Sequence, residues 1–462
     1  MSSLPLIAIV GQPNAGKSTL MNKIAGKPLA VTSDIAGTTR DRQYVDTNWS
    51  GVDFTLVDTA GLALDSKEGL ELSLMKQIEV ALDQADVVIL VVDGKEPVGA
   101  VNEATLKKFR KIKKPLLLAI NKLDSARSHG EKLGEFQKLG IKPAFPVSSI
   151  SGLGLGDMLE HITESLKSLG LTQEKEEPAV GIAVSIVGKP NVGKSSIFNK
   201  ILDEERVVVS PIPGTTRTAI DSRVKINDVD YTFIDTAGLK KKEYRQAQPD
   251  IFSGFQTFKA IRRSDVCFMV IDASQEITKQ DQVVANEIIN MEKGCVILAN
   301  KCDLMKAEKA AGTLGKSTSS LDKGRGDAYQ NVRDYISHHF PFLWMCPLIF
   351  VSAISGEGLS EALEAVKPIF AARNKTIAQE KLDEFLKTVL KKNSPKLLRD
   401  QKKPKVFSLH QKDVNPPKFE LVVNHSGAIS SQFRKFLENS IIKHLDFWGT
   451  PIILKLRGKD KK

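Results

Sequence analysis

A glycine-rich motif that could bind phosphate occurs twice in the chain. Residues 11–18 read Gly-Gln-Pro-Asn-Ala-Gly-Lys-Ser, and residues 188–195 read Gly-Lys-Pro-Asn-Val-Gly-Lys-Ser. The glycines let backbone N–H groups turn toward a phosphate, and a following helix adds the partial positive charge of its N-terminus. Lys17 and Lys194 would reach the β- and γ-phosphates and act as the catalytic cations, while Ser18 and Ser195 would ligate Mg²⁺. The predicted contacts of the two loops, with the residue after each, are Gly11, Gln12, Pro13, Asn14, Ala15, Gly16, Lys17, Ser18 and Thr19, and Gly188, Lys189, Pro190, Asn191, Val192, Gly193, Lys194, Ser195 and Ser196.

A second repeated motif selects the base of the nucleotide. Residues 121–124 are Asn-Lys-Leu-Asp, and residues 300–303 are Asn-Lys-Cys-Asp. An Asp carboxylate can accept hydrogen bonds from guanine N1–H and the 2-amino group, whereas adenine has neither donor there. The Asn would contact the base edge and order the loop, and the Lys stem would pack on the purine. We therefore expect GTP or GDP at two sites, with base contacts from Asn121, Lys122, Leu123 and Asp124, and from Asn300, Lys301, Cys302 and Asp303.

A third repeated motif, Asp-Thr-Ala-Gly-Leu, is expected to begin with an Asp that ends a strand and to sense the γ-phosphate. It comprises Asp58, Thr59, Ala60, Gly61 and Leu62 in the first copy, and Asp235, Thr236, Ala237, Gly238 and Leu239 in the second. Each Asp would hold Mg²⁺ through water, and each Gly would offer its backbone N–H to the γ-phosphate. Thr39 and Thr216 are expected to close over Mg²⁺, with Thr38 and Thr215 as the alternatives. Loss of the γ-phosphate would release these segments, which is how nucleotide-gated switches work.

The position that often holds a water-orienting Gln is occupied by leucine in both copies. Leu62 and Leu239 follow the glycine of the third motif. A leucine side chain cannot orient water, so intrinsic hydrolysis should be slow. Lys17, Lys194 and Mg²⁺ would then supply most of the charge stabilisation.

These motifs recur in one order, which requires two homologous domains in tandem. The phosphate loop and the third motif return after 177 residues, and the base motif returns after 179. In the first copy, apolar runs over 4–10, 54–58, 87–93 and 116–121 predict buried strands, and helical spacing over 70–82 and 102–112 predicts helices. This alternation favours an α/β fold with a mainly parallel sheet, and it places the motifs at strand ends.

The C-terminal part of the chain predicts a small basic α+β domain. Its pattern gives a helix over 377–391, strands over 405–409 and 418–423, a helix over 430–444 and a strand over 451–456. Residues 374–462 contain 20 Lys or Arg against 9 Asp or Glu, which accounts for the whole net charge of +11 and suggests a polyanionic partner. Candidate RNA phosphate contacts are Lys402, Lys403, Lys405, Arg457, Lys459, Lys461 and Lys462, with a solvated basic face and tail as the alternative. We expect Phe407, Phe419, Phe433, Phe436 and Phe447 in the core.

Several functional classes are disfavoured by what the sequence lacks. The longest apolar runs are far shorter than the roughly 20 residues that span a bilayer, and no secretory leader is evident, so we expect a cytoplasmic protein without a membrane role. The four cysteines lack metal-ligand spacing and are expected to be reduced thiols. A GTPase partner of a tRNA-modification or other RNA-processing complex is the alternative, but no Cys nucleophile follows Cys346.

Taken together, the motifs resemble the EngA (Der) family of bacterial GTPases over nearly the whole chain. Further similarity lies in residues 257–265 (Thr-Phe-Lys-Ala-Ile-Arg-Arg-Ser-Asp), 414–419 (Val-Asn-Pro-Pro-Lys-Phe) and 447–452 (Phe-Trp-Gly-Thr-Pro-Ile). The resemblance implies two consecutive P-loop GTPase (G) domains and a KH-like domain. The corresponding ranges are 1–171, a linker at 172–179, 180–373 with an inserted loop near 305–330, and 374–462. The last range lacks the Gly-x-x-Gly that KH domains use to clamp nucleotides.

The resemblance also implies a role in ribosome biogenesis. It predicts GTP-controlled binding to the large (50S) subunit and its rRNA, and two fused G domains favour a monomer. Related GTPases without the water-orienting Gln use K⁺ held partly by a P-loop Asn; Asn14 and Asn191 occupy that position, or else only shape their loops. The chain departs from the family pattern in three places. Ala36 replaces a common Pro, and Thr218 stands where an Asp is usual and where Asp41 keeps the pattern in the first copy. In the loops that the resemblance implies as guanine contacts, the usual pair is Ser-Ala; Ser148-Ser149 departs from it and Ser352-Ala353 keeps it.

Overall fold

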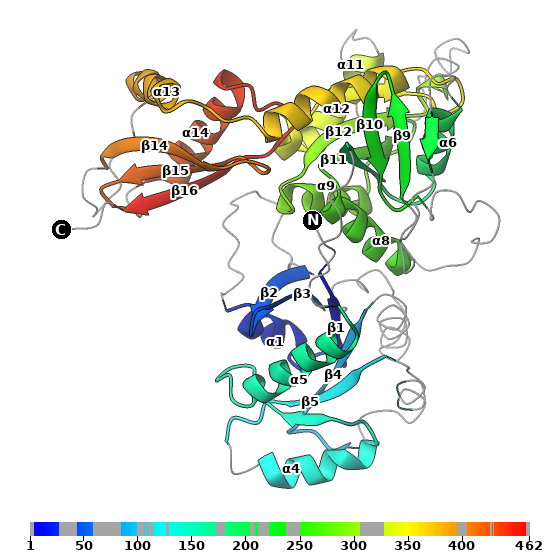
Figure 1. The fold of residues 1–462 in the computed structure, drawn as a ribbon, viewed down its shortest axis with the longest axis vertical. Coiled ribbons are helices and arrows are strands. Elements are labelled where there is room, and N and C mark those ends of the chain that lie inside the picture. Colours follow the sequence, from blue (N-terminus) through cyan, green and yellow to red (C-terminus); the bar gives the residue numbers. More distant parts are fainter. Residues whose placement is uncertain are drawn as a thin grey trace. The chain divides into compact units, whose positions relative to one another are not determined.

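The computed structural model describes residues 4–26, 44–58, 85–98, 106, 109, 114–125, 129–171, 181–203, 208–210, 221–236, 250–304, 328–393, 395, 404–425, 427 and 429–458. The chain divides into two compact units, one formed mainly by residues 1–177 and the other mainly by residues 178–462. Figure 1 shows both units as ribbons.

The first unit is built on a six-stranded sheet with the order β2-β3-β1-β4-β5-β6, in which only β2 is antiparallel to its neighbour. Its strands are β1 (Leu6–Gly11), β2 (Tyr44–Trp49), β3 (Val52–Asp58), β4 (Val87–Asp93), β5 (Leu116–Asn121) and β6 (Ala144–Pro146). The central strands are rich in Val, Ile and Leu and are buried on both faces, as a parallel sheet between helices requires.

Helices cover both faces of this first sheet. On one face, α1 (Lys17–Ile24) and α5 (Leu155–Ser168) contribute to the core, and α5 does so with apolar residues three and four positions apart. On the other face lie α4 (His129–Phe136) and η4 (Gln137–Leu139), which bury Phe136 and Leu139. The sheet is therefore the middle layer, and its strand ends are free to carry the site.

The second unit begins with a seven-stranded sheet of the same design. The strand order is β13-β12-β11-β7-β10-β9-β8, and β9 pairs antiparallel with both of its neighbours, β10 and β8. The strands are β7 (Ile182–Val187), β8 (Val208–Ser210), β9 (Ser222–Ile226), β10 (Val229–Phe233), β11 (Val266–Asp272), β12 (Gly294–Asn300) and β13 (Leu348–Val351). One face is covered by α6 (Lys194–Leu202) and α12 (Leu359–Arg373), and the other by α8 (Asp250–Arg263), α9 (Lys279–Asn290), α11 (Ala328–His339) and η5 (Pro341–Leu343).

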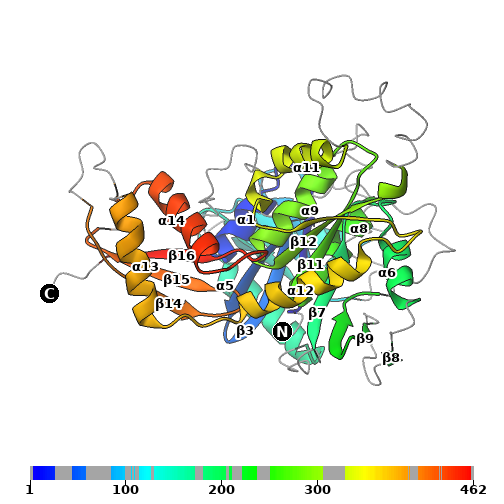
Figure 2. The ribbon, with the colours of Figure 1, turned by 90° about the horizontal axis from the view of Figure 1, so that it is seen from above.

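The C-terminal domain packs two helices on one face of a three-stranded sheet. Its elements are α13 (Gln379–Lys392), β14 (Val406–Asp413), β15 (Lys418–Val423), α14 (Ser431–His444) and β16 (Ile453–Gly458), with β15 between an antiparallel β14 and a parallel β16. The helices contact each other and lie side by side across the sheet (Figures 1 and 2). Alternate strand residues such as Leu409, Phe419 and Leu421 point into the core beneath them.

A buried arginine joins this domain to the second sheet. Arg373, the last residue of α12, is 1% exposed. Its Nε and Nη2 atoms donate to Asn415 Oδ1 at 3.0 and 2.8 Å, and Nη1 donates to Thr450 Oγ1 at 2.9 Å and to the Glu292 carbonyl at 2.8 Å. Asn415 Nδ2 in turn donates to Asp265 Oδ1 at 3.3 Å. Every polar atom of the guanidinium is thus satisfied, as burial demands.

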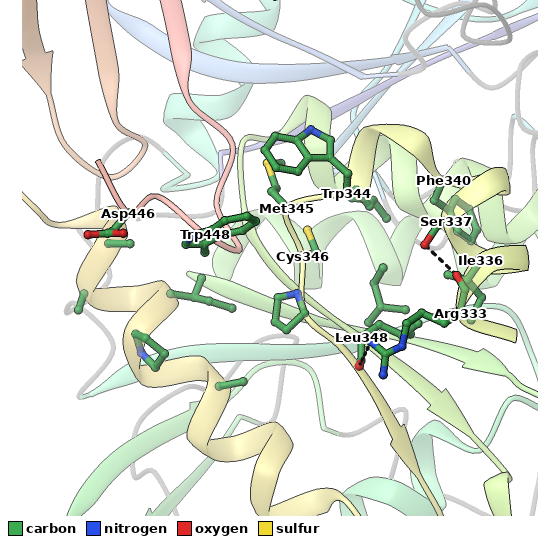
Figure 3. A pocket seen from close by; sticks show the side chains of 18 of the residues that line it. Arg333, Ile336, Ser337, Phe340, Trp344, Met345, Cys346, Leu348, Asp446 and Trp448 are labelled. Carbon is green, nitrogen blue, oxygen red and sulfur yellow. Dashed lines mark hydrogen bonds between the residues drawn. The ribbon is translucent and has the colours of Figure 1, made fainter. Parts of the chain in front are cut away.

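The same joint contains a tryptophan pair and a cavity. The Trp344 and Trp448 rings meet edge to face with their centroids 5.7 Å apart. Between them, Gly449 donates its N–H to the Met345 carbonyl at 2.9 Å and accepts at its own carbonyl from Cys295 N–H at 2.8 Å. A cavity of about 1020 Å³ opens beside the pair, lined mainly by apolar side chains from α11, α12 and the segment at Trp344–Leu348 (Figure 3).

Most of the predicted elements are confirmed. The mainly parallel sheets and the α-β-β-α-β order of the C-terminal domain are found, and β4, β5 and β15 have the predicted bounds. The expectation for Phe407 is wrong, because this ring is 41% exposed and lies under the Lys405 ammonium at 5.8 Å, whereas Phe419, Phe433 and Phe447 are buried. The predicted helix at 70–82 lies outside the described residues, and of the predicted helix at 102–112 only residues 106 and 109 are described. Of the predicted insertion at 305–330, only residues 328–330 are described, and they form the start of α11.

Cys267, Cys295 and Cys302 are buried free thiols, and Cys346 is a half-buried one. In the portion of the chain that the structure describes, no helix combines the length and apolar character needed to cross a bilayer.

Candidate nucleotide sites

The first phosphate-binding loop is a tight turn between β1 and α1. Gly11 lies so close to β4 that a Cβ atom there would come within 2.2 Å of the Val91 carbonyl oxygen. Gly16, at the N-cap of α1, has φ +89° and faces the Asn121 side chain. Lys17 is buried, and its ammonium donates to the carbonyls of Gly11 and Gln12 at 2.8 Å each. The loop therefore places one cation and a helix N-terminus at the end of β1, as phosphate binding requires.

The second loop, between β7 and α6, repeats this geometry. Gly193 has φ +98°, and Lys194 Nζ donates to the carbonyls of Gly188 and Lys189 at 2.8 and 2.7 Å. Burial lowers the pKa of the lysine in both loops, and for Lys194 the pKa falls to about 8, with nearby Asp281 opposing the shift. An anionic ligand would favour the charged form of either lysine.

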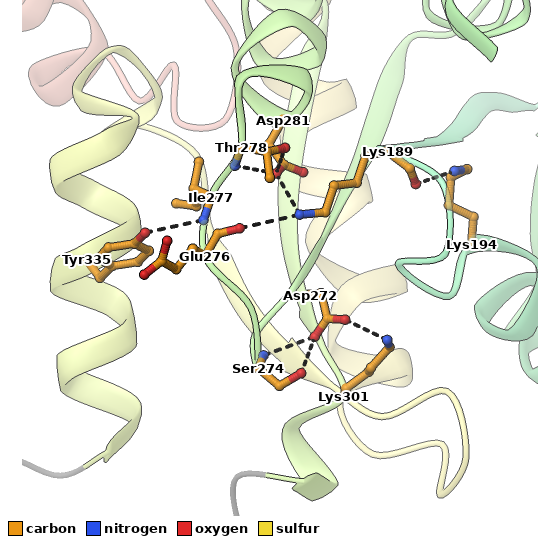
Figure 4. A network of polar contacts seen from close by, with 10 residues as sticks. All are labelled: Lys189, Lys194, Asp272, Ser274, Glu276, Ile277, Thr278, Asp281, Lys301 and Tyr335. Carbon is orange, nitrogen blue, oxygen red and sulfur yellow. Dashed lines mark hydrogen bonds and ion pairs between the residues drawn. The ribbon is translucent and has the colours of Figure 1, made fainter. Parts of the chain in front are cut away.

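The second loop also carries an ion pair of its own (Figure 4). Lys189 Nζ lies 3.0 Å from Asp281 Oδ2, with side chains 10% and 2% exposed, and it also donates to the Glu276 carbonyl at 3.4 Å. The same Asp281 oxygen accepts from the Thr278 N–H and hydroxyl at 2.8 and 2.7 Å, which caps α9. The uncharged Gln12 takes the place of Lys189 in the first loop.

The first site brings together the side chains predicted to hold Mg²⁺. The Ser18 hydroxyl donates to Asp58 Oδ2 at 2.5 Å, and Asp58 is the last residue of β3, as expected. A hydroxyl and a carboxylate at this separation suit the oxygen-ligand preference of Mg²⁺, either directly or through water.

The second site differs at the corresponding carboxylate. Asp235 lies two residues beyond the end of β10, so the expectation that it ends the strand is wrong. Its backbone is left-handed, with φ +54°, and its N–H donates to Asp221 Oδ1 at 3.1 Å instead of continuing the ladder. Asp221 itself is bound by Arg263 from α8, so the turn is held by side chains rather than by the sheet.

Hydrogen bonds connect several of the predicted base contacts of the first site to one another and to its phosphate loop. Asn121 Nδ2 donates to the Ala15 carbonyl at 2.8 Å, and Asn121 Oδ1 accepts from the Ser149 N–H at 3.0 Å and hydroxyl at 2.7 Å. Ser148 Oγ donates to Asp124 Oδ1 at 2.7 Å, and this bond lowers the pKa of the Asp124 carboxyl. Asp124 is therefore held as an exposed carboxylate, the acceptor that guanine would need.

The base contacts of the second site follow the same plan with fewer hydroxyl contacts. Asn300 Nδ2 donates to the Val192 carbonyl at 2.7 Å, and Asn300 Oδ1 accepts from the Ala353 N–H at 3.2 Å. The Ser352 hydroxyl accepts from the backbone N–H groups of Ile354 and Ser355, both at 3.3 Å.

Two carboxylates at this end of the sheets were not predicted. Asp93, at the end of β4, pairs with Lys122 at 2.6 Å, and Asp272, at the end of β11, pairs with Lys301 at 2.5 Å (Figure 4). Each pair orients the lysine of the base motif. The available signal was that both aspartates end an apolar run and stand 28 residues before the asparagine of that motif.

The asparagines proposed as K⁺ ligands take the same conformation in both loops. Asn14 and Asn191 both have φ +64°, a left-handed backbone that asparagine tolerates better than most residues. Both side chains are exposed. The turn alone explains an asparagine here, and the exposed amide oxygen leaves room for a cation.

Thr236 is buried, and its hydroxyl lies 2.9 Å from the Ser222 hydroxyl. Some of the predicted residues of these sites lie outside the described residues. Those outside are Ala36, Thr38, Thr39, Asp41, Thr59, Ala60, Gly61 and Leu62, and Thr215, Thr216, Thr218, Ala237, Gly238 and Leu239.

Comparison with known proteins places these sites in a family context. A family model described as 50S ribosome-binding GTPase matches residues 6–122 and 183–301, and one described as the C-terminal KH-domain-like region of EngA bacterial GTPase enzymes matches 376–457. GTPase Der of Protochlamydia amoebophila is 36% identical over 462 residues, covering 100% of this chain and 90% of that protein. GTPase Der of Clostridium botulinum (strain Okra) is 35% identical over 458 residues, covering 99% of each. Among solved structures, the G domain of the T. maritima FeoB iron transporter is 28% identical with a TM-score of 0.26, covering 35% of this chain and 98% of that one.

Proposed function

Because this chain belongs to the Der (EngA) family and is a GTPase, we propose that it hydrolyses GTP at two sites and uses the bound nucleotide to control its association with the large (50S) ribosomal subunit. The phosphate loop is repeated, with a lysine that is buried in the first loop and half-buried in the second and with a base-motif asparagine bonded to each loop, which supports two sites.

At each site, the residues divide into those that hold phosphate and those that select the base. Lys17 and Lys194 would stabilise charge that develops between the β- and γ-phosphates, and Asp124 and Asp303 would accept from guanine. Mg²⁺, held by Ser18 with Asp58 and by Ser195 with Asp235, would neutralise phosphate charge. The third repeated motif, together with Thr39 and Thr216, would sense the γ-phosphate.

We extend the proposal to K⁺ at Asn14 and Asn191. Leu62 and Leu239 cannot orient water, so a cation beside the phosphates would supply charge that the side chains lack. Faster GTP hydrolysis in KCl than in NaCl at equal ionic strength would support this role, and equal rates would contradict it.

The C-terminal domain is the proposed contact with rRNA. Its excess of 11 positive charges is the single observation that carries this assignment beyond family membership. Lys405 and Arg457 lie on its strands or beside them, within the described residues, and the other predicted phosphate contacts lie outside them. Binding through such cations should weaken steeply with salt and depend little on sequence.

Co-sedimentation with purified 50S subunits tests the partner directly. The full chain is loaded with GDP or with a non-hydrolysable GTP analogue, at low and at moderate salt. Binding with the analogue alone would support a triphosphate-gated switch on the large subunit. Absence of binding in both states at low salt would overturn the partner while leaving GTP hydrolysis in place.

Exchange of the base-selecting carboxylates tests the nucleotide assignment. Asp124→Asn or Asp303→Asn replaces one of the two carboxylate oxygens that would accept from guanine with an amide NH₂ donor, which suits the 2-oxo group of xanthine. We expect the affinity of the altered site for GDP to fall about a hundredfold or more, with a gain for xanthosine diphosphate. Titration of both nucleotides should give one GDP per variant chain; an unchanged count of two would contradict the assignment.

A further inference from the structure

The two base-recognition ends differ by one buried hydroxyl. In the first site, Asn121 Oδ1 accepts two hydrogen bonds from Ser149, one from its N–H at 3.0 Å and one from its Oγ at 2.7 Å. In the second site, Asn300 Oδ1 accepts from the Ala353 N–H at 3.2 Å, and an alanine has no hydroxyl to add. This difference coincides with the departure from the usual Ser-Ala pair at Ser148-Ser149.

The hydroxyl of Ser149 acts on a residue that connects both ends of the site. Asn121 holds the Ala15 carbonyl through Nδ2 at 2.8 Å, and its amide lies where a Cβ on Gly16 would come within 2.3 Å. A rotation of the Asn121 amide would therefore disturb the phosphate loop as well as the base edge. Two acceptor bonds on Oδ1 and one donor bond on Nδ2 fix the amide against such a rotation.

The environment of this contact shields it from water. Asn121 and Ser149 are 1% and 4% exposed. A hydrogen bond in such surroundings meets little competition from solvent, and its loss leaves a buried acceptor with one partner fewer. Ser148 extends the same order to the base-selecting carboxylate, since its hydroxyl donates to Asp124 Oδ1 at 2.7 Å. The base end of the first site is thus fixed before nucleotide arrives.

We propose that Ser149 is a positioning residue for guanine recognition, which slows nucleotide release from the first site by fixing Asn121, and that Ala353 leaves the second site without this contribution. The inference rests on the proposed function, because it assumes that Asn121 and Asp124 hold guanine. A pre-positioned recognition group avoids the ordering cost at binding, so the benefit appears mainly as slower dissociation. One buried hydrogen bond corresponds to a change of about two- to tenfold.

The test exchanges the hydroxyl between the two sites in the full chain. Ser149→Ala is made in an Asp303→Asn background, where the first site alone should take GDP, and Ala353→Ser is made in an Asp124→Asn background. Release of fluorescently labelled GDP is followed by stopped flow. We expect Ser149→Ala to speed release about two- to tenfold and Ala353→Ser to slow it by a similar factor. Ser151→Ala, in the same loop but with an exposed hydroxyl, is the matched control and should leave release unchanged.

A second readout separates positioning from a general loosening of the domain. Pyrophosphate occupies the phosphate loop without a base, so in competition against labelled GDP its affinity should fall less than the affinity for GDP when Ser149→Ala is compared with its background. Equal weakening of pyrophosphate and GDP, or unchanged GDP release in Ser149→Ala, would overturn the proposal.

Failure of the underlying function is distinguishable from failure of this inference. Two GDP molecules bound per Asp303→Asn chain would contradict the guanine role of Asp303. Ser149 would still be tested, since in the otherwise unaltered chain Ser149→Ala must speed one of the two release phases. If neither phase changes there, the inference is wrong.

Discussion

The lysine of the second phosphate loop has a titration that differs from that of an exposed lysine. Burial lowers the pKa of Lys194 to about 8, while the two carbonyls that it contacts and Asp281 nearby do not compensate fully. Between about pH 8 and 10.5, the unfolded chain binds the proton that folded, nucleotide-free Lys194 has released. The free energy of unfolding of this state therefore rises with pH in that window, because a buried charge has been removed.

The same titration predicts weaker nucleotide binding above pH 8. Phosphates favour the charged lysine, so above its pKa binding must take up a proton, and affinity falls by at most about tenfold per pH unit. GDP titrations of the Asp124→Asn chain between pH 7 and 9, which read the second site, should show the decline beginning near pH 8.

Lys194→Arg provides the control, because a guanidinium keeps its charge throughout this range. The variant should bind GDP more weakly but with a flat profile. A decline of the same size in both proteins would assign the pH effect to another group.

Most residues of the sites are evident from the sequence because phosphate and guanine recognition fix both residue types and spacing. Sequence motifs therefore predict Lys17, Asn121 and their repeats as site residues. The contacts of Asp93 with Lys122 and of Lys189 with Asp281 were not predicted, since they join residues 29 and 92 positions apart without a shared motif. Such pairs depend on how strand ends and helices meet in space.

At the scale of elements, the ion pair between the second phosphate loop and α9 should stabilise the second sheet domain. Lys189→Gln, which copies Gln12 of the first loop, leaves Asp281 buried with only its bonds to Thr278. Breaking one side of a buried pair should lower the free energy of unfolding by about 3 kcal/mol. Thermal scanning of the full chain should show a lower transition for the second unit.

Lys279→Gln is the matched control, because Lys279 is an exposed lysine in the first turn of the same helix. It should shift the transition by less than about 0.5 kcal/mol. Equal effects of the two substitutions would show that the Lys189–Asp281 pair contributes no specific stability.

Elements were predictable where one physical cause determines them. Continuous Val, Ile and Leu runs define β4 and β5 because both faces are buried, and alternation defines β15 because only one face is. Asp235 departs from its counterpart because Asp221 captures its N–H, a contact that no local pattern signals. Phe407 differs from its predicted core position because β14 presents one face to solvent, and the sequence alone did not show which face that is.

At the scale of the whole molecule, Arg373 holds the C-terminal domain against the second sheet. Arg373→Ala would leave Asn415, Thr450 and the Glu292 carbonyl without their donors and would remove a large buried side chain. We expect a loss of about 3–5 kcal/mol in the free energy of unfolding of the second unit, measured by denaturant titration.

Arg333→Ala is the corresponding control. Arg333 is an exposed arginine of α11, and it donates a long hydrogen bond of 3.5 Å to the Leu348 carbonyl. Its loss should cost less than about 1 kcal/mol. If both variants lose the same stability, the buried hydrogen bonds of Arg373 do not hold the joint.

The tandem repeat made two similar sheets predictable. The joint between the C-terminal domain and the second sheet was not predictable, because it brings together residues between 265 and 450 that share no motif. The joint has a practical consequence. The chain contains three tryptophans, and Trp344 and Trp448 meet edge to face across it. With Trp49→Phe, all indole emission would arise from this pair. Separation of the C-terminal domain from the second sheet would then change the wavelength and the intensity of the intrinsic tryptophan emission. The contact between the two can therefore be followed by fluorescence without an attached dye.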